Sequence, residues 1–167
     1  PLARRARARV VLSPATRIDP GARRVEIEGR PPLVWDVASL DVGSTVRGLD
    51  RPGVREHALA TRPIRHFVDA LEARLERASA ARGGEPVRVV VVGGGAAGIE
   101  LAFTLDHRLA ERDVPCELTL VSGDSRPLPD APRRVAARIA RLADARGVRL
   151  RTGLEVEAVE KEAVRVR

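Results

Sequence analysis

The first part of the chain alternates between hydrophobic and polar positions, a pattern typical of β-strands. Residues 23–29 alternate with a period of two directly after a turn at residues 19–21, and we therefore predict an antiparallel strand there. Two further apolar stretches, residues 8–12 and 33–42, predict two more strands. A loop rich in glycine, proline and arginine follows, to about residue 60.

A helical period replaces this alternation after Pro63. Apolar side chains recur at intervals of three and four residues, which predicts an amphipathic helix over residues 64–80. Pro63 suits the first position of such a helix, where its missing N–H costs nothing. The stretch at residues 83–86 ends the helix, and we place a domain boundary after residue 84. The apolar positions of the helix are Ile64, Phe67, Val68, Leu71, Leu75 and Ala78.

The second half of the chain alternates strands with helices. Residues 87–92 form an apolar, β-branched run that is too short for a helix, so we predict a buried parallel strand. The elements expected after it are a helix at 96–111, a strand at 117–121, a helix around 135–142 closed by Gly147, a strand at 148–151, and a hairpin of residues 154–159 and 163–166. This order predicts an α/β fold of the doubly wound, Rossmann type.

The loop between the first strand and helix of this unit is glycine-rich. Gly93 to Gly98 satisfy the pattern G-x-G-x-x-G in the strand-to-helix context that the pattern requires. Gly93 permits a tight turn, Gly95 lets a pyrophosphate approach the backbone, and Gly98 allows close packing of helix on sheet. The helix N-terminus attracts phosphate. We therefore predict an NAD(P) site formed by Gly93, Gly94, Gly95, Ala96, Ala97 and Gly98.

The loop has two other interpretations. A glycine turn that merely joins a strand to a helix is the structural alternative. A nucleoside-triphosphate P-loop is excluded, because no Gly-Lys-Ser/Thr follows the glycines.

The residues after the second strand should contact the adenosine ribose. An acidic residue at this position binds the ribose hydroxyls of NADH, whereas arginine accepts the 2′-phosphate of NADPH. Here the expected acidic position holds Ser122, followed by Asp124 and Arg126. Asp124 and Arg126 favour opposite cofactors, and Arg126 also has a plain interpretation as a surface charge. The sequence therefore leaves NADH and NADPH open.

The chain is strongly basic, with 30 Lys and Arg against 23 Asp and Glu and a formal net charge of +7. All but one of the basic residues are arginine, the exception being Lys161, and acidic residues are interspersed among them. This pattern favours a solvated basic surface over a nucleic-acid site. Aromatic side chains that could stack on bases are scarce, being only Trp35, Phe67 and Phe103.

Composition excludes several further classes. No apolar run approaches the roughly 18 residues that a membrane span needs. Cys116 is the only cysteine, so the sequence holds neither a disulfide nor a redox-active cysteine pair. No cluster of His, Cys and Asp has metal-ligand spacing, and no metal site is expected. Because the chain begins at Pro1 and lacks Met, we expect it to be a segment of a longer protein.

Several single residues have a structural interpretation beside a functional one. His57, His66 and His107 are expected to be structural or exposed, and Cys116 to be a small buried hydrophobe. Asp130 is expected to help start the helix that follows it. Glu100 lies in the first turns of the helix after the glycine loop, where the helix dipole favours a carboxylate.

Three stretches together resemble one protein family. They are residues 35–44 (WDVASLDVGS), residues 55–64 (REHALATRPI) and residues 91–102 (VVGGGAAGIELA). They are similar to the pyridine nucleotide–disulfide oxidoreductases, flavoproteins that bind two dinucleotides, and to their type II NADH dehydrogenase-like branch. Within that branch the chain looks most like the oxidoreductase fused to, or encoded with, selenide, water dikinase.

The resemblance implies an FAD domain interrupted by an NAD(P) domain. Residues 1–84 would be part of the FAD domain, with Gly43 and Ser44 in a turn that faces the flavin nucleotide. Residues 85–167 would be an NAD(P) domain that is incomplete at its C-terminal end. Glu100 would lie near the nicotinamide carboxamide and orient it on the flavin. The implied cofactors are FAD and NAD(P)H, and the implied partner or fusion is a selenophosphate synthetase.

Two classes of function follow from these observations. The first is a segment of a flavin-dependent NAD(P)H oxidoreductase, inactive on its own and cytoplasmic, with peripheral membrane contact of the full-length protein left open. The second is a non-catalytic nucleotide-binding or interaction module that partners an enzyme of selenium metabolism. Arg62 stands where many relatives carry Lys, and Ser122 is not acidic. The absence of paired redox cysteines favours the dehydrogenase-like branch, but the electron acceptor and the oligomeric state stay open.

Overall fold

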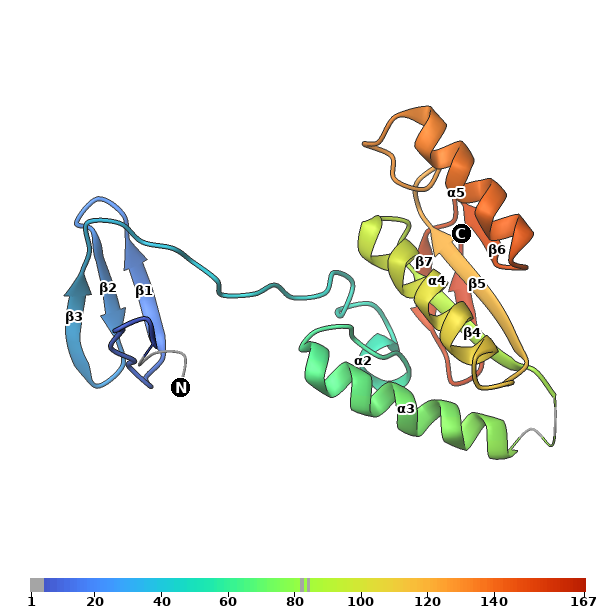
Figure 1. Ribbon diagram of the computed structural model, residues 1–167, viewed down its shortest axis with the longest axis horizontal. Coiled ribbons are helices and arrows are strands. Elements are labelled where there is room, and N and C mark those ends of the chain that lie inside the picture. Colours follow the sequence, from blue (N-terminus) through green and yellow to red (C-terminus); the bar gives the residue numbers. More distant parts are fainter. Residues whose placement is uncertain (1–4, 82, 84) are drawn as a thin grey trace. The chain divides into compact units, whose positions relative to one another are not determined.

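The computed structural model describes residues 5–81, 83 and 85–167. The chain forms two compact units, Pro1–Gly43 and Ser44–Arg167 (Figure 1). The boundary predicted after residue 84 separates the expected FAD part of the chain from the expected NAD(P) part, and it stays a prediction. The sequence also allows residues 2–6 to be the last turn of a helix, and residues 2–4 of that stretch lie outside the described residues.

The first unit is a three-stranded antiparallel meander. Its strands are β1 (Ala15–Asp19), β2 (Arg24–Ile27) and β3 (Arg30–Val34), in the order β1-β2-β3. The turn predicted at residues 19–21 is confirmed, and its Asp19 Oδ1 accepts a hydrogen bond from the N–H of Ala22 (2.9 Å). That bond lowers the pKa of Asp19, because it stabilises the carboxylate form. The strand predicted at residues 23–29 is β2.

The two other strand predictions in this unit were wrong. Residues 8–12 are irregular, and the strand that pairs with β2 begins only at Ala15. The strand predicted over residues 33–42 ends at Val34, which pairs with Arg24, the first residue of β2. A strand needs a partner for its backbone hydrogen bonds. After Val34 the N–H of Trp35 still donates to the carbonyl oxygen of Arg23 (3.0 Å), but the turn before β2 leaves no neighbouring strand for the residues that follow.

The second unit contains the α/β fold that the sequence predicts. Three parallel strands lie in the order β4-β5-β6, joined by helices, and two antiparallel strands follow. In chain order the elements are α2 (Val54–His57), α3 (Ile64–Ala81), β4 (Val87–Val92), α4 (Ala96–Ala110), β5 (Cys116–Ser122), α5 (Arg133–Ala145), β6 (Arg149–Thr152), β7 (Val156–Val159) and β8 (Val164–Val166). Gly147, with φ of +70°, follows α5 as predicted.

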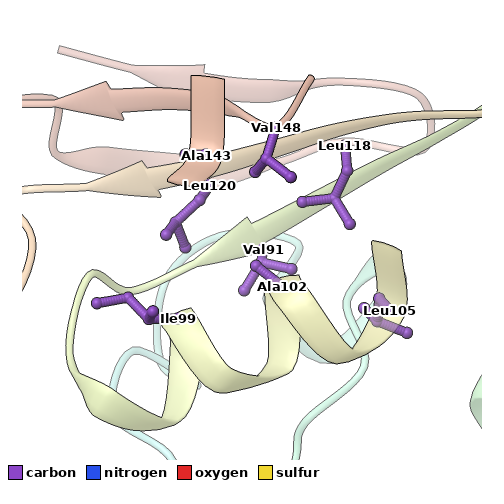
Figure 2. Close-up of a cluster of buried hydrophobic side chains, with 8 residues drawn as sticks. All are labelled: Val91, Ile99, Ala102, Leu105, Leu118, Leu120, Ala143 and Val148. Carbon is purple, nitrogen blue, oxygen red and sulfur yellow. The ribbon is translucent and has the colours of Figure 1, made fainter. Parts of the chain in front are cut away.

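A buried apolar cluster holds α4 on the sheet. Figure 2 shows Ile99, Ala102 and Leu105 along one side of α4, facing the strands β4 and β5. Val91 and Leu120 are paired across β4 and β5 and contribute to the same cluster. The complete cluster is Val91, Ile99, Ala102, Leu105, Leu118, Leu120, Ala143 and Val148. Because both ends of the loop between β4 and α4 are held by this core, the loop has a fixed geometry.

Helix α3 packs beside α4 through apolar and charged contacts. Leu75 of α3 packs against Val87 and Leu109. On the same helix Glu72 forms ion pairs with Arg108 (2.7 Å) and Arg112 (2.6 Å), both near the end of α4. The hydrogen bond from Arg112, aided by the charges of both arginines, lowers the pKa of Glu72. Of the apolar positions predicted for this helix, Phe67 and Leu75 are buried, whereas Ile64 and Val68 are exposed.

We expect Glu72→Gln to lower the melting temperature at pH 7. The pKa of Glu72 is lower in the folded chain than its ordinary value of 4.5. The carboxylate therefore stabilises the fold above pH 4.5, and this stabilisation is lost as the pH falls through the lowered pKa. Thermal unfolding at pH 7 and at steps below pH 4.5 measures the effect. Glu76→Gln, at an exposed glutamate of the same helix, is the control. Equal melting temperatures of the two variants at pH 7 would contradict the prediction.

The segment before α3 is held against β7. It contains the short helix α2, which the predicted loop to residue 60 did not include. Arg51 donates a hydrogen bond to the carbonyl oxygen of Val156. At Gly53, whose φ is +72°, an added Cβ would lie 1.9 Å from the carbonyl oxygen of Val159, so the contact requires glycine.

In the described part of the chain, no helix is both long enough and apolar enough to cross a membrane.

Candidate functional site

The predicted glycine loop leaves the sheet at the carboxyl end of β4. The N–H of Gly93 donates to the carbonyl oxygen of Val121 (2.8 Å), which continues the pairing of β4 with β5 by one residue. Gly93 then has a φ of +120°, a conformation that side chains disfavour strongly. The tight turn predicted at Gly93 is therefore present in the fold.

Two glycines of the loop are required by packing inside the protein. A Cβ at Gly98 would lie 1.9 Å from the carbonyl oxygen of Gly93, so α4 can approach the turn only with glycine there. A Cβ at Gly94 would lie 2.3 Å from the Oγ of Ser122. Gly94 is buried, and its carbonyl oxygen accepts a hydrogen bond from the N–H of Leu128 (2.9 Å). These contacts join the loop to the end of β5 and to the segment after it.

Gly95 differs from its neighbours because packing inside the fold does not require it. Its φ of −76° is one that any residue adopts, and a Cβ built there would meet nothing within 4 Å. Gly95 is the N-cap of α4, and its carbonyl oxygen accepts the hydrogen bond of Ile99 (3.1 Å). The space that its missing side chain leaves open is therefore space at the N-terminus of a 15-residue helix.

This arrangement fits the pyrophosphate of a dinucleotide. The first N–H groups of a helix have no partner within the helix, and those of α4 belong to Ala96, Ala97 and Gly98. Donors of this kind, together with the helix dipole, bind phosphate. Gly95 supplies the close backbone approach that a side chain would prevent.

The three residues expected to contact the adenosine ribose have different environments. Ser122 is 1% exposed, and its Oγ accepts a hydrogen bond from the N–H of Asp124 (3.2 Å). Asp124 is exposed. Arg126 is partly buried and donates hydrogen bonds to the carbonyl oxygens of Pro129 and Ala131 (2.8 Å to Ala131). The structure thus brings Ser122 to the glycine loop and holds the guanidinium of Arg126 in its own loop.

Glu100 lies on α4 directly after the buried Ile99, and it is exposed. It is five residues beyond the N-cap Gly95, at the end of α4 that borders the glycine loop. Its role at the nicotinamide stays a prediction.

Gly43 and Ser44, which the resemblance assigns to a flavin contact, lie in an irregular stretch of the chain. Gly43 ends the first unit and Ser44 begins the second. Gly43 has a φ of +72°, and a Cβ there would meet nothing within 4 Å. Residues 41–46 are irregular and form no turn, so the turn predicted at Gly43 and Ser44 was wrong, and the contact of these two residues with a flavin nucleotide stays a prediction.

The other candidate side chains take part in local contacts. The backbone carbonyl oxygen of His57 accepts a hydrogen bond from Arg74 (2.6 Å), and His107 of α4 lies 3.4 Å from Glu111, the C-cap residue of that helix. His66 is exposed. The expected helix-starting role of Asp130 was wrong, because Pro132 is the N-cap of α5 and no side chain caps it.

The thiol of Cys116 has low reactivity. It is partly buried at the start of β5, and burial raises the pKa of its thiol to about 11, with smaller effects of Asp106 and Glu117. The thiol is therefore protonated at neutral pH and is a poor nucleophile. In the described ranges, no group of three or more His, Cys, Asp and Glu side chains could hold a metal ion.

The packing of Gly94 on Ser122 was missed at the level of the sequence. The pattern G-x-G-x-x-G leaves its second position free, so it assigns no role to Gly94. The third consecutive glycine and the small residue at the end of the second strand were the available signals. Neither signal could show that the two residues touch, because they belong to different strand ends.

A comparison with protein families gives one match. The family described as pyridine nucleotide-disulphide oxidoreductase matches residues 3–167. A search of the curated proteins finds no match.

Solved structures share the fold. A ferredoxin reductase from Rhodopseudomonas palustris is similar with a TM-score of 0.71 at 18% identity, over 99% of this chain and 38% of that protein. NDH2 from Plasmodium falciparum, solved in complex with NADH, has a TM-score of 0.72 at 15% identity, over 94% of this chain and 36% of that protein. An NAD-dependent persulfide reductase from A. fulgidus has a TM-score of 0.67 at 22% identity, over 99% of this chain and 30% of that protein. The chain thus spans about a third of the length of these proteins.

Proposed function

This chain belongs to the pyridine nucleotide-disulphide oxidoreductase family, and we propose that it provides the nicotinamide-dinucleotide site of a flavin-dependent NAD(P)H oxidoreductase. The proposal extends the family membership to an activity. The similar structures support it by their fold, and one of them was solved in complex with NADH.

The observation that carries the proposal is the open space at Gly95. Gly94 and Gly98 are glycine because the fold leaves no room for a side chain, whereas Gly95 has room that nothing in the chain uses. A glycine that is dispensable for packing, at the N-terminus of a helix, is explained by close approach of a ligand to the backbone. Glycine is one of several residues that suit an N-cap, and a turn that only joined β4 to α4 would accept serine, threonine, aspartate or asparagine at this position.

The chain's own residues bind and orient the dinucleotide in this proposal. The N–H groups at the start of α4 hold the pyrophosphate, and Gly95 leaves the space for it. A bound flavin supplies the redox chemistry, by accepting a hydride from the reduced nicotinamide. In this proposal Glu100 orients the nicotinamide carboxamide, and Gly43 and Ser44 contact the flavin nucleotide, as the sequence resemblance implies. The proposed cofactors are therefore NAD(P)H and FAD.

The finer assignment is the type II NADH dehydrogenase-like branch. Cys116 is the only cysteine of the sequence, and its protonated thiol suits no disulfide chemistry. The association with a selenophosphate synthetase and the cytoplasmic location are parts of the same proposal that rest on the sequence resemblance alone.

Titration with NADH and with NADPH tests the proposal. We expect calorimetry on the purified protein to show binding of at least one of the two. In protein that carries its flavin, that nucleotide should bleach the flavin absorbance in the absence of oxygen. Binding without bleaching would favour the non-catalytic nucleotide-binding module. Absence of binding to a folded protein would contradict the proposal.

A further inference from the structure

The loop that follows β5 bears on the choice between NADH and NADPH. In dinucleotide-binding folds an acidic group near the end of the second strand binds the ribose hydroxyls of NADH, and arginine accepts the 2′-phosphate of NADPH. The sequence offered Ser122, Asp124 and Arg126 without ranking them. Their environments in the structure do rank them.

Ser122 is committed to packing under the glycine loop. Its side chain is buried against Gly94, where an added Cβ would lie 2.6 Å from the Cβ of Ser122 as well. Its Oγ already accepts the hydrogen bond from the N–H of Asp124. Ser122 therefore cannot form a hydrogen bond with a ribose that lies above the loop.

The side chain of Arg126 is held by hydrogen bonds within its own loop. Both of its terminal nitrogens donate to backbone carbonyl oxygens, those of Ala131 and Pro129, and the side chain is partly buried. Three N–H groups of the guanidinium remain, but moving it out of its loop towards a 2′-phosphate would break both hydrogen bonds and leave two carbonyl groups unpaired, which is costly.

Asp124 is the group that remains. Its backbone is held on both sides, because its N–H donates to Ser122 and its carbonyl oxygen accepts from the N–H of Gly153 (2.8 Å). Its side chain is exposed. The contacts from Gly94 to Ser122 and from Ser122 to the N–H of Asp124 hold the backbone of Asp124 close to the glycine loop, from which its exposed carboxylate extends into solvent. A carboxylate accepts hydrogen bonds from ribose hydroxyls and repels a phosphate at the same position.

We propose that the chain selects NADH over NADPH through Asp124, two residues beyond the end of β5. The inference rests on the proposed function, because it concerns the same dinucleotide site. Arg133, the first residue of α5, lines a shallow hollow with Arg126, Ser125 and Thr152. It is the alternative anchor for a 2′-phosphate, and a preference for NADPH would point to it.

Calorimetric titration with NAD⁺ and NADP⁺, which bind without transferring a hydride, tests the inference. We expect the unchanged protein to bind NAD⁺ at least about tenfold more tightly. Asp124→Ala should weaken NAD⁺ by about tenfold to a hundredfold and should not weaken NADP⁺. The control Asp130→Ala removes the same charge from an exposed position of the same loop, and should change both affinities by less than about threefold.

The outcomes separate this inference from the proposed function. Tighter or equal binding of NADP⁺ by the unchanged protein would overturn the role of Asp124 and leave the dinucleotide site intact. Equal weakening of both nucleotides by Asp124→Ala, or no weakening of NAD⁺, would also overturn it. If the folded protein binds neither nucleotide, the proposed function fails and the inference fails with it.

Discussion

We expect Gly95→Val to abolish the binding of NADH and NADPH while the protein stays folded. The backbone of Gly95 is in a conformation that valine adopts without strain, and a Cβ there would meet no atom of the protein within 4 Å. The valine side chain would instead fill the space that we assign to the pyrophosphate. Its clash with a ligand held by the first N–H groups of α4 should weaken binding at least about a hundredfold, or about 2.8 kcal/mol.

The fold should lose little in this variant. Gly95 is the N-cap of α4, and valine is a poorer N-cap than glycine, so a cost of about 1 kcal/mol is expected. Calorimetric titration with NADH, beside a thermal unfolding curve, measures both effects on one preparation. A variant that melts near the unchanged protein and binds NADH normally would show that the loop is structural.

Gly98→Val is the matched comparison, because it places the same side chain three residues further along the same helix. There the new Cβ would overlap the carbonyl oxygen of Gly93, so α4 could not keep its contact with the turn. We expect a clear loss of stability at this position, with loss of binding as its consequence. Gly95→Val should lose binding and keep its fold, whereas Gly98→Val should lose both. This contrast separates a glycine needed by the ligand from a glycine needed by packing.

The sequence predicted the parallel sheet well because each of its elements carries its own signal. The valine run of β4 is apolar on both faces, and the glycines that follow mark the turn and the helix start. The hydrophobic pattern then places Ile99, Ala102 and Leu105 on the side of α4 that packs on the sheet. Local pattern and tertiary packing agree for α4. The prediction of a buried strand was wrong for one face of β4, because Val87 and Val91 are buried whereas Val90 and Val92 are exposed.

The first unit was predicted less well because its strands depend on partners. Residues 33–42 are as apolar as a strand, but β2 offers a partner only as far as Val34. Beyond that residue the chain is irregular, whatever its own preference for a strand. The length of an antiparallel strand is set by the shorter neighbour and by the turn between them, and neither is visible in the strand's own residues.

The candidate site also has features that the sequence predicted and features that it could not predict. The roles of Gly93 and Gly98 follow from the motif and are visible in the fold. The contact of Gly94 with Ser122 joins two strand ends, and the hydrogen bonds of Arg126 close a loop, so neither could be derived from residue types alone. These contacts turn an open choice between Asp124 and Arg126 into a testable preference.

We expect Glu100→Gln to slow the reduction of a bound flavin by NADH by about tenfold to a hundredfold. Glu100 is exposed at the end of α4 that borders the glycine loop, and the family resemblance implies that it accepts a hydrogen bond from the nicotinamide carboxamide. A hydrogen bond to a charged acceptor is worth about 1.5–3 kcal/mol, and the neutral amide would lose part of it. Misplacement of the nicotinamide then lowers the rate through orientation.

The alternative interpretation of Glu100 predicts a different result. If the carboxylate only interacts with the dipole of α4, its neutralisation should cost less than about 1 kcal/mol of stability and leave flavin reduction unchanged. Rapid mixing of NADH with the oxidised flavoprotein measures the rate, and thermal unfolding measures the stability. An unchanged rate with a lowered melting temperature would assign Glu100 to the dipole.

Two controls make the rate change specific to nicotinamide positioning. Glu111→Gln removes the same charge from an exposed residue at the other end of α4, and it should leave the rate unchanged. ADP-ribose contains the pyrophosphate but no nicotinamide, so its affinity should be the same in Glu100→Gln as in the unchanged protein. A variant that binds ADP-ribose normally and reduces flavin slowly has lost an interaction with the nicotinamide, because the pyrophosphate contacts at Gly95 and the start of α4 are still intact. Equal weakening of ADP-ribose would instead mean that Glu100 supports the loop, and the assigned role would be wrong.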